Sequence, residues 1–118
     1  MVRVKRIVPN LEAEDPAGMA AFYRALFDLD VLMDMGWIVT LGNGADTPVQ
    51  LSVASEGGSG TPVPHLSIEV DDPDAVHARA LENGAEVVYP LTDEPWGARR
   101  FFVRDPGGRI INVLTHLS

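Results

Sequence analysis

Hydrogen-bonding side chains alternate with aliphatic ones in the second half of the chain, at a spacing that suits a binding surface. His65, Ser67 and Glu69 are each separated by one aliphatic residue. Successive side chains of a β-strand point to opposite faces, so these three share one face if the segment is a strand. Asn112 has aliphatic neighbours in the last apolar segment and is placed in the same way. These groups could bind a polar small molecule or supply ligands to a metal ion.

The first half of the chain contains a counterpart of this pattern. Asn10 and Glu12 oppose Leu11 and Ala13 in a predicted first strand. We expect the polar sets of both halves to line one shared concave surface. The alternative is that they are simply exposed to solvent, as on many antiparallel sheets.

These residues do not predict a conventional metal site. A divalent metal needs at least three converging protein ligands, and about 13 Å of strand separates His65 from Glu69. The chain has no cysteine, so thiolate ligands and thiolate nucleophiles are excluded. His77, in a predicted helix, and His116, near the C-terminus, are expected to be surface residues. For His65 itself, a hydrogen-bonded histidine is the alternative to a metal ligand, and we expect no tightly bound catalytic metal.

Two tryptophans could add flat apolar surfaces. Trp37 follows a glycine and Trp96 precedes one, and both positions allow a ring to line the mouth of a cavity. Packing in a core or an interface is the alternative for each. If both rings face a cavity, they and the nearby carboxylates favour a planar, cationic ligand through stacking and cation–π attraction.

The elements that position these residues come from an internal repeat. VPNL at 8–11 returns as VPHL at 63–66, and RAL at 24–26 returns at 79–81. Each copy predicts a strand, a helix opened by an Asp-Pro pair that caps it, and three further strands. The sequence therefore predicts an α+β fold of two tandem βαβββ modules, with a cup-shaped mixed sheet and the helices on its outer face.

The predicted element boundaries follow from apolar periodicity and turn residues. In the first module, which spans about 1–55, they are a strand at 3–13, a helix from Asp15 to Leu26, and strands at 31–33, 37–41 and 49–53, with a Gly42-Asn43-Gly44 turn before the last. A flexible connector is expected at 56–61. The second module, about 62–118, has a strand at 64–70, a helix from Asp72 to Leu81 that stops at Asn83-Gly84, and strands at 86–89, 99–104 and 110–115, with an Asp105–Gly108 turn.

Composition limits the classes of partner. The chain has 118 residues, which predicts a single domain. Its net charge of −8, from 17 acidic and 9 basic residues, argues against binding to nucleic acid or to anionic membranes. No apolar run approaches the ~18 residues that span a bilayer, and no signal-peptide pattern opens the chain, so we expect a cytoplasmic protein.

The segments that carry the repeat resemble a known family. NLEAEDPAGMAAFYRALF, HLSIEVDDPDAVHARALENGAEV and FFVRDPGGRIINVL are together similar to the vicinal oxygen chelate superfamily of glyoxalase I, extradiol dioxygenases and bleomycin-resistance proteins. PNL, AAFY and DMGW, in that order, look most like the bleomycin-resistance branch, whose members bind the drug without a metal. The resemblance implies a homodimer, because single-domain members commonly complete their cavities with a partner.

The resemblance also implies where metal ligands would stand. The first-strand ligand position falls on Val8 or Asn10, neither of which is a good ligand, and the closing-strand glutamate is replaced by Asn112. His65 alone matches a ligand position with a strong ligand. No GxSxG, HExxH or cysteine nucleophile is present, so an enzymatic activity is uncertain and not favoured.

The function predicted from these observations is metal-free binding of an aromatic or cationic small molecule. The expected ligand-binding residues are Asn10, Glu12, Trp37, His65, Ser67, Glu69, Trp96 and Asn112. A metal-dependent lyase, isomerase or dioxygenase that uses His65 with atypical co-ligands is the first alternative. An interaction or regulatory module without a small-molecule ligand is the second.

Overall fold

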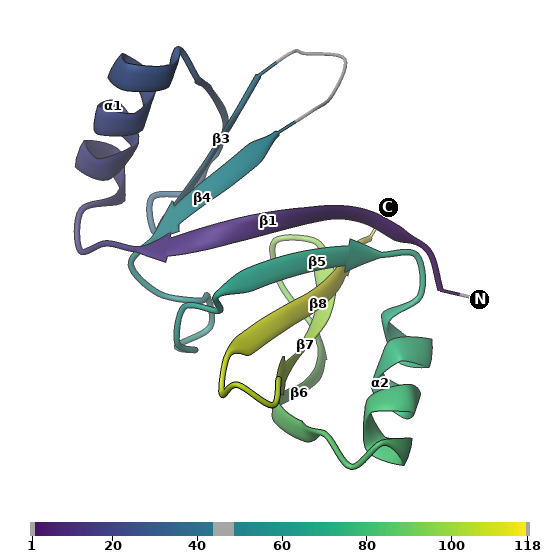
Figure 1. Cartoon of the computed structure of the whole chain (residues 1–118). Coiled ribbons are helices and arrows are strands. Elements are labelled where there is room, and N and C mark those ends of the chain that lie inside the picture. The colour runs from purple at the N-terminus through teal and green to yellow at the C-terminus, as the bar shows by residue number, and fades with distance from the viewer. Residues whose placement is uncertain (1, 44–48, 118) are drawn as a thin grey trace. The chain divides into compact units, whose positions relative to one another are not determined.

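The computed structural model describes residues 2–43 and 49–117 (Figure 1). In chain order its elements are β1 (Val4–Glu12), α1 (Pro16–Phe27), β2 (Asp30–Asp34), β3 (Ile38–Gly42), β4 (Gln50–Ala54), β5 (Leu66–Val70), α2 (Pro73–Glu82), β6 (Glu86–Asp93), β7 (Ala98–Arg104) and β8 (Ile110–His116). The order of strands and helices predicted from the repeat is confirmed, and most boundaries agree within two residues. The predicted Gly42-Asn43-Gly44 turn lies partly outside the described residues.

The chain forms two compact units. The N-terminal unit comprises Val8–Val63, and the C-terminal unit comprises Met1–Ile7 together with Pro64–Ser118. Strand β1 is therefore divided, because its first residues belong to the C-terminal unit. There the amide of Arg3 donates to the carboxylate of Asp71, and the amide of Asp71 donates to the carbonyl of Arg3, at 3.0 and 3.1 Å.

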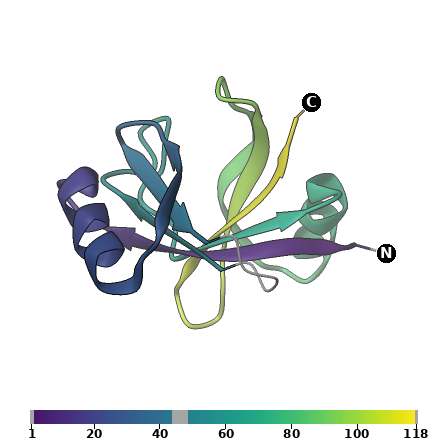
Figure 2. The same ribbon diagram turned by 90° about the horizontal axis from the view of Figure 1, so that it is seen from above.

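The sheet of each unit has the same mixed pattern. In the N-terminal unit β1 pairs with β4 in parallel, and β4–β3 and β3–β2 are antiparallel. In the C-terminal unit β5 pairs with β8 in parallel, and β8–β7 and β7–β6 are antiparallel. The predicted α+β class is thus confirmed, with one helix on one face of each sheet (Figure 2).

Each helix packs one side on its own sheet. Ala20 of α1 joins a buried cluster with Val39, Leu41 and Val53. In the C-terminal unit Phe101, which is fully buried, packs with Val70 and Val113 and with residues of α2. The ring of His77 meets Phe101 edge-on, with 5.0 Å between ring centroids. His77 is therefore half-buried against the core rather than the surface residue that the sequence predicted, because imidazole can pack as an aromatic ring.

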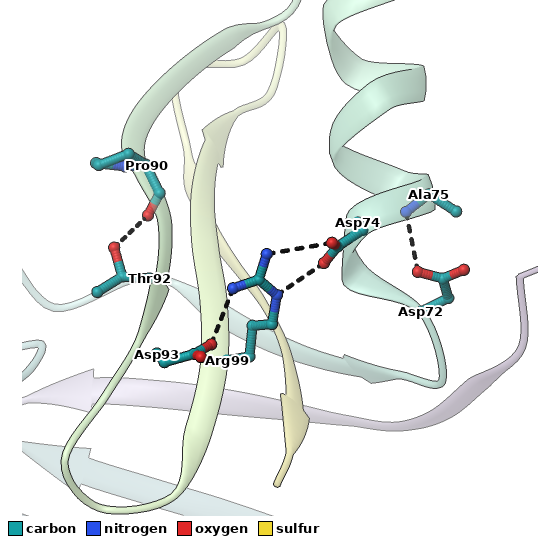
Figure 3. Close-up of polar contacts among 7 residues, drawn as sticks. All are labelled: Asp72, Asp74, Ala75, Pro90, Thr92, Asp93 and Arg99. Carbon is teal, nitrogen blue, oxygen red and sulfur yellow. Dashed lines mark hydrogen bonds and ion pairs between the residues drawn. The ribbon is translucent and has the colours of Figure 1, made fainter.

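Polar contacts fix the start of α2 and its position on the sheet (Figure 3). The carboxylate of Asp72 caps the helix by accepting from the amide of Ala75 at 3.1 Å. Arg99 of β7 donates to Asp74 of α2 and to Asp93 of β6, at 2.8 and 2.9 Å. The hydrogen bond from Arg99 lowers the pKa of Asp74, and the two carboxylates raise the pKa of Arg99. The Asp-Pro start predicted for this helix is confirmed.

The predicted connector at 56–61 forms a closed loop. The amide of Gly57 donates to the carbonyl of Thr61 at 2.8 Å, and the Thr61 hydroxyl donates to the carbonyl of Gly58 at 2.7 Å. Three successive residues, Gly58, Ser59 and Gly60, have positive φ. Glycine here allows the left-handed turn that closes these hydrogen bonds, so the composition of a linker produces a defined turn.

No helix in the described part of the chain is long and apolar enough to cross a membrane.

Candidate functional site

The sheet of the C-terminal unit brings several predicted site residues together on the face opposite α2. Its register pairs Ser67 with Asn112, and Asn112 with Phe102 of β7. Two residues further along β5, Glu69 lies beside Leu114 of β8, and Leu114 lies beside Arg100 of β7. We call this surface the polar face, and its side chains are Ser67, Glu69, Tyr89, Glu94, Arg100, Phe102, Asn112, Leu114 and His116.

Asn112 is buried at the centre of the polar face. Its Nδ2 donates to the Ser67 hydroxyl oxygen at 3.0 Å. The residue is only 7% exposed, and its buried Oδ1 has no hydrogen-bond partner among the described residues. An orphaned buried acceptor costs about 1–3 kcal/mol. Turning the amide over would exchange the two atoms and orphan Nδ2 instead, so either orientation leaves a hydrogen-bonding group for something else to satisfy.

Glu69 connects β5 to β8 and to the start of the chain. Its carboxylate contacts Arg6 and the Nδ1 of His116, the latter at 2.8 Å. Burial alone would raise the pKa of Glu69, but the hydrogen bonds and charges of His116 and Arg6 outweigh it and lower the pKa below 4.5. His116 is exposed, as predicted, but it is held in β8 by this contact.

The lowered pKa gives Glu69→Gln an expected pH dependence. A depressed carboxyl pKa contributes stability above the unfolded value of 4.5 and loses it as the pH falls through the folded value. Arg6 and His116 are partly exposed, so the substitution should cost about 0.5–1 kcal/mol at neutral pH, and the difference should shrink in acid. Urea unfolding from about pH 7 to about pH 3 measures it. Glu82→Gln, at an exposed position on α2, is the control. A Glu69→Gln difference that grows in acid would contradict this account.

A buried arginine occupies the other end of the polar face. Arg100 donates to Glu94 at 2.7 Å, and the two side chains are only 4% and 2% exposed. Its guanidinium lies over three aromatic rings, at 4.7 Å from the centroid of Phe102, 4.9 Å from Trp96 and 5.2 Å from Tyr89. Cation–π attraction and the ion pair together compensate for the loss of water around this charge.

Trp96 is therefore engaged within the protein. Its half-buried ring lies against Arg100, so packing describes at least part of its role. Glu94 is engaged as well, because its Oε2 also accepts from the Tyr89 hydroxyl at 3.0 Å. The arginine, the glutamate and the tyrosine satisfy one another, which suits a rigid support for the polar face.

His65 is used by the backbone. It is exposed at the start of β5, where its amide donates to the carbonyl of Ile110 at 2.8 Å. Its Nδ1 accepts from the amide of Ile110 at 3.3 Å. That contact places the ring proton on Nε2, so neither nitrogen offers a lone pair to a metal unless this hydrogen bond is given up. The alternative of a hydrogen-bonded histidine describes this arrangement.

Two of the predicted residues of the N-terminal unit, Asn10 and Glu12, lie on the face of its sheet opposite α1. Asn10 is half-buried and pairs in register with Ser52, and exposed Glu12 pairs with Ala54. Beside Ser52, Thr40 forms a buried hydroxyl–hydroxyl contact with it at 2.8 Å. Trp37 precedes β3 and is half-buried, and its carbonyl accepts from the amide of Ser55 at 2.9 Å. Ligand binding by these residues stays a prediction.

No group of three or more histidine, aspartate or glutamate side chains that could hold a metal ion occurs within residues 2–43 and 49–117. The acceptors on the polar face are two hydroxyls, an amide oxygen, an imidazole and two carboxylates, and both carboxylates are already paired with cationic side chains. This donor set fits hydrogen bonding to a ligand better than it fits a divalent ion.

Sequence reasoning missed Arg100, Glu94 and Tyr89. In the RRFFVR segment the two adjacent arginines point to opposite faces, and Arg99 forms surface ion pairs while Arg100 is buried. An arginine in a strand is normally assigned to solvent, so the burial of Arg100 was not predicted. The strand period contained a signal for it, because it places Arg100 on the same face as Phe102 and Asn112.

The chain has relatives of known sequence and structure. An uncharacterized protein of Mycobacterium bovis is 33% identical over an alignment that covers 85% of this chain and 76% of that protein. A structure described as the NAD-dependent benzaldehyde dehydrogenase of Legionella pneumophila has a TM-score of 0.77 at 18% identity, with 94% of this chain and 99% of that one covered. The structure of a glyoxalase/bleomycin resistance protein/dioxygenase superfamily member from Vibrio splendidus has a TM-score of 0.62 at 19% identity, with 96% of this chain and 99% of that one covered. At these identities the structures show the fold alone.

A family model matches residues 4–113, nearly the whole chain. The match is to a superfamily as a whole, so the likeness to its bleomycin-resistance branch stays a prediction. The duplicated βαβββ order, the mixed sheets and the structural neighbours agree with that match. The chain belongs to the Glyoxalase/Bleomycin resistance protein/Dioxygenase superfamily.

Proposed function

We propose that this protein is a cytoplasmic, metal-free small-molecule binding protein that sequesters an aromatic or cationic compound. The observation that supports this most directly is the buried Oδ1 of Asn112, which has no partner among the described residues. A ligand that donates an N–H or O–H there would remove the cost of that orphaned acceptor. The Ser67 hydroxyl next to it gives the ligand a second polar contact.

Binding is favoured over catalysis by the way the ionisable groups are used. Glu69 is held by Arg6 and His116, and Glu94 is held by Arg100 and Tyr89. A general base needs a carboxylate or imidazole within reach of a substrate proton, and these groups are occupied by partners within the protein. The proposed ligand-binding set also keeps Asn10, Glu12, Trp37, His65 and Trp96 from the sequence prediction.

Asn112→Leu tests the proposal because it separates binding from stability. Leucine has a similar size and removes the orphaned acceptor, so the free energy of unfolding should stay within about 1 kcal/mol of wild type or rise. Ligand affinity should fall about 10- to 100-fold, because the donor of the ligand loses its acceptor. Ser67→Ala is the matched variant, which removes the neighbouring hydroxyl and keeps Oδ1.

The measurement is a thermal-shift screen of cationic aromatic compounds, followed by calorimetry on any compound that binds. A ligand at 100 times its Kd adds about 2.7 kcal/mol of stability. Mn²⁺, Ni²⁺, Fe²⁺ and Zn²⁺ are screened in parallel with the His65→Ala variant. A stoichiometric metal that His65→Ala abolishes would overturn the metal-free proposal, and binding that Asn112→Leu leaves unchanged would overturn the proposed site.

We also propose that the protein acts as a homodimer. This is common among relatives of this size, and the described residues offer an apolar surface for it, which is argued next.

A further inference from the structure

Helix α1 presents large apolar side chains to solvent. Met19, Phe22, Leu26 and Phe27 are 38, 57, 59 and 62% exposed. The first three lie at positions i, i+3 and i+7, which places them along one side of the helix. We call these four residues the α1 surface. A soluble protein does not gather so many large apolar side chains on one exposed helix without a reason.

Helix α2 shows how the same fold treats a solvent-facing helix. Counted from the capping residues Asp15 and Asp72, the position of Phe22 in α1 corresponds to Arg79 in α2. The exposed residues of α2 include Asp74, Arg79 and Glu82, whereas Arg24 is the one charged residue in the sequence of α1. Among the exposed large apolar side chains, α2 carries Leu81, whereas α1 carries four, so the apolar surface is a feature of α1 rather than of the fold.

The rings on the α1 surface are held in place. Phe22 and Phe27 both contact the ring of Tyr23, with centroids 5.4 and 6.1 Å apart. An exposed surface whose side chains are already ordered loses less conformational entropy when a partner covers it. This arrangement favours a docking surface over loosely exposed apolar residues.

The exposed apolar area is more than half of what one partner contributes to an interface of standard size. The α1 surface exposes roughly 400 Å², since an aromatic side chain carries about 150–250 Å². Strand β2 follows the helix directly, and its Val31, which pairs in register with Leu41 of the cluster under α1, is 42% exposed on the same side. Together they expose roughly 450–500 Å², which is more than half of the about 800 Å² per partner in an interface of standard size.

We infer that the α1 surface is where a second copy of this chain docks. Each copy carries a net charge of −8, so two copies repel one another least where acidic groups are absent. No acidic residue occurs in α1 between its cap Asp15 and Asp28. A two-fold axis would place the same residues of both copies against one another, which needs a self-complementary apolar surface of this kind. The inference specifies the homodimer proposed above and does not depend on the ligand.

The first experiment measures mass in solution by light scattering at several concentrations. Wild type should be a dimer at micromolar concentration. Phe22→Lys and Leu26→Lys should each weaken the dimer at least about 100-fold, because each loses a buried apolar side chain in both copies. Leu81→Lys, at a 58% exposed position on α2, is the matched control and should remain dimeric. Circular dichroism checks that each variant is folded.

The outcomes separate this inference from the broader proposals. A monomeric wild type would overturn both the inference and the homodimer. A dimer that survives Phe22→Lys and Leu26→Lys, or that Leu81→Lys disrupts instead, would overturn the inference and leave the homodimer standing. Ligand binding by the Asn112 site is measured independently of either result.

A second measurement does not depend on disruptive variants. The chain has no cysteine, so a single introduced thiol can bond only to its copy. Ala21→Cys and Ala25→Cys on α1 are each oxidised under mild conditions, and at least one should give a covalent dimer, since a disulfide requires Cα atoms within about 7 Å. Ala78→Cys, exposed on α2, should stay monomeric on the same gel. Efficient cross-linking by Ala78→Cys alone would contradict the inference.

Discussion

Replacing Glu94 by alanine is expected to lower the free energy of unfolding by about 3–5 kcal/mol, because it leaves the buried guanidinium of Arg100 without its counter-ion. Only 4% of the Arg100 side chain is exposed, so water cannot replace the lost carboxylate. The Tyr89 hydroxyl loses its acceptor at the same time. The three aromatic rings around Arg100 attract the cation, but they do not neutralise it.

Urea denaturation measures this effect, and the control is Glu86→Ala. Glu86 forms a 3.3 Å ion pair with Arg104, but these side chains are 66% and 38% exposed, so its loss should cost no more than about 1 kcal/mol. The double variant Glu94→Leu with Arg100→Met removes both buried charges and should recover most of the stability. If Glu94→Ala costs no more than Glu86→Ala, the buried pair does not stabilise the polar face.

Replacing Phe101 by alanine is expected to cost about 3–5 kcal/mol through the cavity that it leaves. Phe101 is fully buried and belongs to the apolar cluster that joins α2 to the C-terminal sheet. The effect should extend to α2, since the ring of His77 packs edge-on against Phe101.

The control for Phe101→Ala is Leu81→Ala on the same unit. Leu81 is 58% exposed, and its truncation should change stability by no more than about 0.5 kcal/mol. Total stability of a domain this size is about 5–15 kcal/mol, so Phe101→Leu provides a milder variant that remains folded. Equal effects of Phe101→Ala and Leu81→Ala on the urea midpoint would show that this cluster is not the core of the unit.

The sequence predicted the elements well because their signals are local. The Asp-Pro pairs at 15–16 and 72–73 identify both helix starts, and the capping contacts of Asp15 and Asp72 confirm them. Strand alternation correctly grouped Ser67 with Glu69, and register then placed Ser67 beside Asn112. These predictions need only a period and a turn, which are properties of neighbouring residues.

What the sequence could not predict depends on contacts between distant segments. The loop at 56–61 has the composition of a linker, and its hydrogen bonds form only when Gly57 and Thr61 come into contact. Burial of Arg100 requires three aromatic rings and a glutamate to converge on it from β6, β7 and the loop between them. The exposure of Phe22 on α1 was also hidden, because apolar periodicity cannot tell which part of a wide apolar face meets the sheet.

The division of strand β1 has a consequence for the order of folding during synthesis. Residues 1–7 leave the ribosome before residues 8–63, yet the unit to which they belong is completed only by residues 64–118. The contact of Arg3 with Asp71 closes a loop that contains the whole N-terminal unit. Because domains fold as their residues emerge, Val8–Val63 can form first while the opening segment waits for β5. A nascent chain stopped after the N-terminal unit should therefore protect β4 from proteolysis and leave residues 2–7 open to cleavage.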